Sequence, residues 1–288
     1  KECCIKKSYN SAVGKMFGDI FENVRKTCPP VHNIVNCVAA NYCANALLAI
    51  GASPIMADGE EEAADIAAAS SAVHLNLGMP NERKLSAMMK AGKAANEKSI
   101  PVLLDLVGVG ASEYRAKTAE MLMNEIRFSV VKGNVTEIKY AAFGSGDANG
   151  VDAGGKDSIT KDNLHVYVEI AKDFSAKFGG VVMITGETDI VSDNKTAFCI
   201  TNGHVMMSKV TGTGCCLSGI TAAFLASNTE TPLVSAAAAA SLMGVAGETA
   251  FKKMTPMCGN ASYGQYIIDA LYNITPYQLE KEAKYEVR

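Results

Sequence analysis

The sequence has no tryptophan, few aromatic residues and little arginine among its 288 residues. The arginines are scattered singly along the chain: Arg25, Arg83, Arg115, Arg127 and Arg288. The formal net charge is −3, and basic side chains are not concentrated in any stretch of the sequence. Because proteins bind nucleic-acid phosphates through clustered Lys and Arg, we expect no nucleic-acid partner.

Metal-binding cysteine motifs and long apolar runs are also missing. Nine cysteines occur without a CxxC motif or a Cys/His pair at zinc-finger spacing. An odd number of thiols in a chain able to form a large core favours a reducing compartment. The Ala-rich stretch 233–246 is interrupted by Ser and Gly, and we expect it to fall short of a membrane span. A cytoplasmic protein with no membrane partner is predicted.

Hydrophobic residues at 48% and charged residues at 20% are typical of a folded protein. Short apolar runs, which we interpret as strands, occur at 34–35, 54–57, 73–77, 101–106, 128–132 and 181–185. Apolar residues at three- and four-residue spacing between them predict helices over 38–50, 61–69, 83–97, 112–124 and 163–178. This alternation predicts an α/β fold, in which helices cover both faces of a mostly parallel sheet.

The pattern changes after residue 185. A hairpin is predicted from 189–192 and 196–201, followed by helices over 215–225, 233–251 and 262–271. The Gly-rich loop 144–155 is too short for a domain linker, and no repeat is present. We therefore expect a single domain over 1–288, with a polar segment 1–27 to which the sequence assigns no role.

Two glycine-rich stretches are candidate phosphate sites. Gly150–Lys156 matches GxxxxGK, but Asp157 replaces the magnesium-binding Ser/Thr and no strand precedes it, so we do not expect a Walker loop. Gly212-Thr213-Gly214-Cys215 precedes an apolar helix, where backbone amides and the helix N-terminus can hold an anion. In the first turn, Cys215 is expected to have a lowered pKa. An ordinary tight turn with a buried Cys215 is an equally good interpretation of these residues.

Charged residues follow two neighbouring strands of the predicted sheet. Asp105 closes one apolar run just before Gly108-Val109-Gly110, where ligands bind in open α/β sheets, and can hold magnesium or cap a helix. Lys132 and Asn134 end the next strand. Glu137 suits either a metal contact or a capping box with Asn134. No GxSxG serine accompanies the histidines, which gives acyl-transfer chemistry no support.

Six segments, in this order, resemble the hydroxyethylthiazole kinases of thiamine biosynthesis and salvage. They are VHNIVNCVAANYCANALLAIGASPIMADGEEE (31–62), VHLNLG (73–78), PVLLDLVGVGAS (101–112), VVKGNVTEI (130–138), ITGETDIVSD (184–193) and NGHVMMSKVTGTGC (202–215). The resemblance implies a ribokinase-like fold and a homotrimer with active sites between subunits. It also implies magnesium- and ATP-dependent phosphorylation of 5-(2-hydroxyethyl)-4-methylthiazole.

The resemblance also implies roles for single residues. It places Met56, Asn36 and Gly212 at the thiazole, Lys132 and Thr185 at ATP, and Asp105 and Glu137 beside magnesium. We also expect Asn134, Thr213 and Gly214 to contact ATP. Cys215 falls where related sugar kinases carry the aspartate base. Two positions depart from the family pattern, which has Arg at 132 and Pro at 106. The alternatives are a kinase of another small alcohol, such as a hydroxymethylpyrimidine or pyridoxal, and a thiazole- or nucleotide-binding protein without catalysis.

Overall fold

The computed structural model describes residues 16–147 and 159–288. The GxxxxGK motif at Gly150–Lys156 and most of the Gly-rich loop lie outside the described residues.

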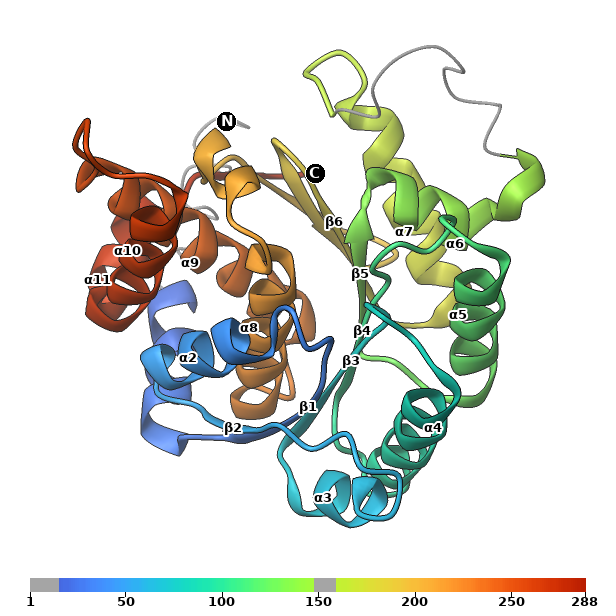
Figure 1. Cartoon of the computed structure of the whole chain (residues 1–288). Helices are drawn as coiled ribbons and strands as arrows, with labels where there is room; N and C mark the ends of the chain where they lie inside the picture. The colour runs from blue at the N-terminus through green and yellow to red at the C-terminus, as the bar shows by residue number, and fades with distance from the viewer. Residues whose placement is uncertain (1–15, 148–158) are drawn as a thin grey trace.

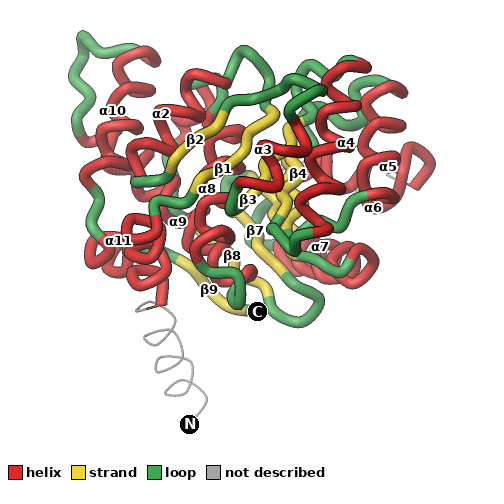
Figure 2. Tube along the Cα trace, turned by 90° about the horizontal axis from the view of Figure 1, so that it is seen from below, coloured by secondary structure: helices red, strands yellow, loops and turns green. Residues whose placement is uncertain are grey.

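A nine-stranded sheet runs through the middle of the molecule, in the order β2-β1-β3-β4-β5-β6-β7-β8-β9 (Figure 2). The strands β1 to β6 pair in parallel, whereas β7, β8 and β9 are antiparallel. Their bounds are β1 Pro30–Ile34, β2 Ser53–Ile55, β3 Ala72–Asn76, β4 Val102–Asp105, β5 Val130–Asn134, β6 Val181–Thr185, β7 Asp189–Ser192, β8 Ala197–Ile200 and β9 Tyr285–Val287. The predicted mostly parallel sheet and the hairpin are confirmed.

Helices cover both faces of the sheet, as predicted (Figure 1). One layer contains α2 (Ala40–Ile50), α8 (Thr213–Ser227), α9 (Pro232–Lys252), α10 (Asn260–Asn273) and α11 (Pro276–Glu282). The other contains α3 (Ala63–Ala69), α4 (Glu82–Glu97), α5 (Glu113–Glu125), α6 (Val135–Asp147) and α7 (Leu164–Phe178). A short 3₁₀ helix, Val205–Lys209, precedes α8.

Side chains that alternate along each strand form two cores. On β4, Leu103 packs into the core beneath α8, whereas Val102 and Leu104 pack into the core on the opposite face. Both faces are buried, so strands such as β4 and β6 consist of apolar residues almost throughout and do not alternate with polar ones. The next position on the α8 side of β4 is Asp105, which places a carboxylate at the end of a buried strand.

The first strand begins earlier than the apolar pattern predicts. We expected it at 34–35, but β1 covers Pro30–Ile34. His32 and Asn33 are polar yet buried, because His32 Nε2 lies 2.7 Å from Ala57 O and Asn33 Nδ2 donates to Val31 O. Hydrophobicity alone does not detect a strand whose polar side chains find partners inside the protein.

Two further expectations need correction. The loop expected from residue 144 begins later, since α6 continues to Asp147 through a non-helical Gly144 with φ 74°. The stretch expected to fall short of a membrane span forms α9, which is 21 residues long and, by length and composition alone, apolar enough to cross a membrane. Its apolar window is 78% buried inside the protein, and α9 packs against α8 and α10 as a core helix.

Some elements were not predicted at all. Residues 16–27 are helical and bury Phe17, Ile20, Phe21 and Val24 in the core, where the ring of Phe21 stacks on Phe224. The short strand β9 completes the antiparallel end of the sheet beside β8.

Candidate active site

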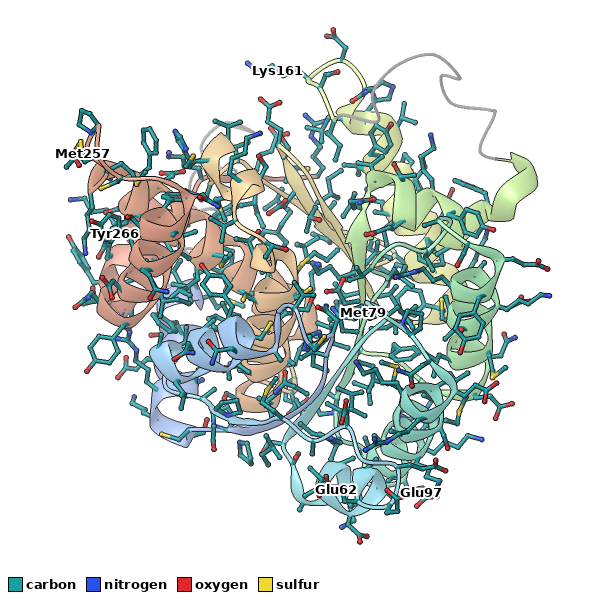
Figure 3. All side chains as sticks on the ribbon, in the orientation of Figure 1. Glu62, Met79, Glu97, Lys161, Met257 and Tyr266 are labelled. Atoms are coloured by element: carbon teal, nitrogen blue, oxygen red, sulfur yellow. The ribbon has the colours of Figure 1, made fainter. Side chains whose placement is uncertain are left out.

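The residues singled out from the sequence follow the carboxyl ends of the parallel strands. They are Met56 after β2, Asn36 after β1, Asp105 at the end of β4, Lys132 and Asn134 at the end of β5, and Thr185 at the end of β6. In a parallel sheet these ends share one edge, which is where ligands bind in open α/β folds. Figure 3 shows Met79 near the middle of the molecule, where the chain leaves β3 between the two helical layers.

Helix α8 begins at this edge. Its N-cap is Gly212, with φ 89°, and a Cβ there would lie 3.2 Å from the Cβ of Ala39, so both backbone and space favour glycine. A Cβ on Gly214 would lie 3.6 Å from Lys132 Nζ. The first turn of α8 therefore lies next to the Lys132 ammonium, and the N–H groups of a first helical turn have no partner within the helix.

Lys132 and Asp105 form a buried ion pair. Lys132 Nζ lies 3.0 Å from Asp105 Oδ1, and the two residues are 4% and 1% exposed. The other oxygen, Oδ2, accepts from Asn76 Nδ2 at 2.9 Å and from Ser218 Oγ at 2.8 Å. Both oxygens of Asp105 therefore contact neighbouring side chains in this structure.

The charge of Lys132 survives burial. Burial acts to lower its pKa, but the Asp105 carboxylate and the nearby Cys215 raise it, and the pKa lies above the usual value. Lys132 therefore remains a cation, and the Asp105 carboxylate holds its ammonium group. Together the two side chains carry no net charge.

Cys215 lies beside two side-chain amides. Its sulfur accepts from Asn76 Nδ2 at 3.3 Å and from Asn36 Nδ2 at 3.5 Å. Burial, and then the Asp105 carboxylate, raise the pKa of the Cys215 thiol to about 11. The prediction of a lowered pKa is therefore wrong, because removal from water outweighs Lys132 and the Asn76 hydrogen bond. Neighbouring Cys216 points away into the core, where its thiol donates to Cys43.

Glu137 forms the predicted capping box. Its backbone N–H donates to Asn134 Oδ1 at 2.9 Å, and its Oε2 accepts from Asn134 N at 2.7 Å. Its Oε1 accepts from Gly108 N at 2.7 Å, while Arg115 Nη1 donates to Val107 O at 2.6 Å. The peptide group between Val107 and Gly108 is thus held at its carbonyl by a guanidinium and at its N–H by a carboxylate.

Sequence reasoning missed three residues of this site. Asn76 ends an apolar strand just as Asp105 does, and that shared position was the available signal. Ser218 lies four residues after Gly214 on α8, hence on the same helix face. Arg115 gave no local signal, since its partners are backbone carbonyls of Leu77 and Val107.

A magnesium ion suits this donor set only together with a ligand. Among residues 16–147 and 159–288, no three or more His, Cys, Asp or Glu side chains gather to hold a metal. Asp105 and Glu137 supply the hard oxygen donors that magnesium prefers. Magnesium is usually bound by one or two carboxylates plus substrate phosphates, so Asp105 and Glu137 would hold an ion that arrives with a nucleotide, in exchange for hydrogen bonds that their oxygens now accept.

Relatives and solved structures agree with this architecture. A hydroxyethylthiazole kinase from Clostridium acetobutylicum is 45% identical over 271 residues, covering 94% of this chain and 99% of the relative. The structure of a hydroxyethylthiazole kinase from Pyrococcus horikoshii is 32% identical with a TM-score of 0.84, over 95% of this chain and 99% of that one. A pyridoxal kinase from Staphylococcus aureus, with a TM-score of 0.59 and 15% identity over 90% and 98% of the two chains, shares the fold alone.

The expected ribokinase-like fold is confirmed by these neighbours. The sequence profile of the hydroxyethylthiazole kinase family matches residues 21–277, a range that contains all six segments. The chain belongs to the hydroxyethylthiazole kinase family.

Proposed function

We propose that this protein transfers the γ-phosphoryl group of ATP to the hydroxyethyl oxygen of 5-(2-hydroxyethyl)-4-methylthiazole. Family membership supports the substrate. The observation that supports the chemistry is the position of the start of α8, which lies beside the buried Lys132–Asp105 pair. The Cys215 sulfur, in the first turn of α8, shares the Asn76 amide with Asp105. Phosphoryl transfer depends on alignment and charge stabilisation, and this arrangement supplies both.

ATP binds toward the β5 and β6 side of the edge. Lys132, Asn134 and Thr185 lie at the carboxyl ends of these strands, and the first-turn amides at Thr213 and Gly214 face the transferring group. Amides fixed in a helix N-terminus stabilise developing negative charge without rearranging. Asp105 and Glu137 would hold magnesium, which when bound neutralises phosphate charge.

The thiazole binds toward the β1 and β2 side, against Met56, Asn36 and Gly212. Met56 follows β2 and is 39% exposed, so its polarizable side chain is available to an apolar ring. Val38, which follows β1 at the same end of the sheet, is 61% exposed. Large exposed apolar side chains support an interface, and we assign a homotrimer in which a neighbouring subunit completes the thiazole site.

Cys215 accepts the proton of the alcohol. Because burial and the Asp105 carboxylate raise its pKa to about 11, only a small fraction of the thiol is ionised at neutral pH, so the base is scarce and turnover is slow. The same reasoning predicts that activity increases as the pH rises from 6 to 9.

A cytoplasmic location and a single domain over residues 1–288 complete the proposal. The odd number of cysteines, nine, supports the location, because free thiols in a chain with a large core favour a reducing compartment.

The test is phosphorylation of hydroxyethylthiazole by purified protein with Mg-ATP, read by mass spectrometry. A panel containing hydroxymethylpyrimidine and pyridoxal tests the alternative that another small alcohol is the acceptor. Isothermal titration with both ligands separates an enzyme from a binding protein. Binding of thiazole and ATP without formation of ADP would contradict the proposed reaction.

A further inference from the structure

The Asn76 side chain, fully buried at the end of β3, uses all of its hydrogen-bonding capacity. Its Oδ1 accepts from Gly78 N at 2.9 Å and from Asn36 Nδ2 at 3.0 Å. Its Nδ2 donates to Asp105 Oδ2 at 2.9 Å and to Cys215 Sγ at 3.3 Å. One amide thus connects four segments of the chain.

The orientation of this amide is determined by its partners. The backbone N–H of Gly78 can only donate, so the oxygen of Asn76 must face it. The NH₂ group must then face the carboxylate and the sulfur. A Cβ at Gly78 would lie 2.8 Å from Asn76 Oδ1 and 2.6 Å from Asn36 Nδ2, so the absence of a side chain there lets the two amides pack closely.

The NH₂ group lies between two acceptors that repel each other when both are charged. The Asp105 carboxylate forms an ion pair with Lys132, and the Asn76 amide lies between this carboxylate and the Cys215 sulfur. A donor that gives one hydrogen to each acceptor relieves this repulsion and fixes the distance between them. Asn36 adds a second N–H toward the sulfur, at 3.5 Å.

We propose that Asn76 is a positioning residue for phosphoryl transfer, whose amide holds the Cys215 sulfur toward the substrate alcohol and apart from the Asp105 carboxylate. This inference rests on the proposed function. It differs from a purely structural role because the effect of Asn76 on the rate must pass through Cys215.

A double-mutant cycle measures that dependence. Asn76→Ala is made in the parent and in a Cys215→Ala background, and kcat and KM are determined for both substrates. In the parent we expect kcat to fall about 10–100-fold with KM changed less than about 3-fold. In the Cys215→Ala background the same substitution should cost less than about 3-fold, because the sulfur it positions is gone.

Asn33→Ala is the matched control. Asn33 is a buried amide on the neighbouring strand, bonded to Val31 O and His74, so its loss should cost the same factor in both backgrounds. Melting temperatures show which variants are folded. If Asn76→Ala does not fold, Asn76→Ser, which retains a hydroxyl donor, runs the same cycle.

Equal losses in the two backgrounds, or a loss confined to KM, would overturn the positioning role while leaving the kinase activity in place. A parent protein that forms no thiazole phosphate at all would instead refute the proposed function.

Discussion

Replacing Lys132 by Met isolates the buried ion pair at the centre of the site. Met has nearly the same length as the lysine stem, so packing is largely kept while the ammonium is removed. Asp105 is then left 1% exposed with no opposite charge at 3.0 Å. Only the hydrogen bonds from Asn76 and Ser218 remain on its carboxylate.

The expected cost follows from that geometry. Breaking a buried pair by removing one partner costs about 3–5 kcal/mol, because a buried charge is left uncompensated. Two neutral donors still satisfy Oδ2, so we expect about 3 kcal/mol, the lower end of this range. Adding Asp105→Asn to Lys132→Met removes the remaining charge and should recover much of the loss.

The assay is the free energy of unfolding from urea denaturation, at one protein concentration for all variants. Lys84→Met is the control, since Lys84 is also buried but its ammonium donates to a neutral acceptor, the Val35 carbonyl, at 3.2 Å. The Lys84→Met substitution leaves no buried carboxylate without a partner and should lower the free energy of unfolding by about 1 kcal/mol. Equal losses for the two lysine variants, or less than about 1 kcal/mol for Lys132→Met, would refute the account of the pair.

The pH dependence has a defined sign. The folded-state pKa of Lys132 is raised above the ordinary 10.5, so its stabilising contribution is complete below 10.5 and is lost as pH rises through the folded value. The difference in unfolding free energy between parent and Lys132→Met should therefore stay constant from neutral pH to about 9 and shrink only in stronger alkali.

Three other predictions concern rate and assembly. Cys215→Ser should lower single-turnover phosphoryl transfer strongly, Cys215→Asp should retain or raise it at neutral pH, and the buried Cys216→Ser should leave it nearly unchanged; a Cys215→Ser enzyme as fast as the parent would show that the thiol only packs. Arg115→Met should raise KM for ATP several-fold, with partial rescue by Arg115→Lys. The Val107 carbonyl loses its donor at 2.6 Å, which loosens the peptide whose N–H is bound by Glu137, the proposed magnesium residue; unchanged nucleotide kinetics would contradict this. Sedimentation equilibrium should give three times the mass of the 30.3 kDa chain, and a monomer mass would contradict the shared site.

Much of the site could be predicted from the order of residues along the chain. Asp105 and Lys132 each stand at the end of an apolar run, and strand ends of a parallel sheet meet at one edge. The start of α8 at Gly212 could be predicted in the same way, because two glycines precede a continuous stretch of small and apolar residues. These are local patterns, in which chain geometry over a few residues sets the outcome.

The partners of these residues could not be predicted from the sequence. Lys132 pairs with a carboxylate 27 residues away, and Cys215 meets an amide 139 residues away. Asn76 looked like the polar end of one more strand, although its side chain joins Asp105, Cys215 and Asn36.

The sequence alone therefore determined the alternation of most strands and helices, the edge of the sheet that carries the candidate site, and the family. Only the tertiary structure decided the chemistry of Cys215. The helix N-terminus by itself suggested a lowered pKa, but burial and the Asp105 carboxylate raise the pKa to about 11. Desolvation and charge at a sulfur depend on what the folded chain packs around it, and residues distant in sequence supply most of that environment.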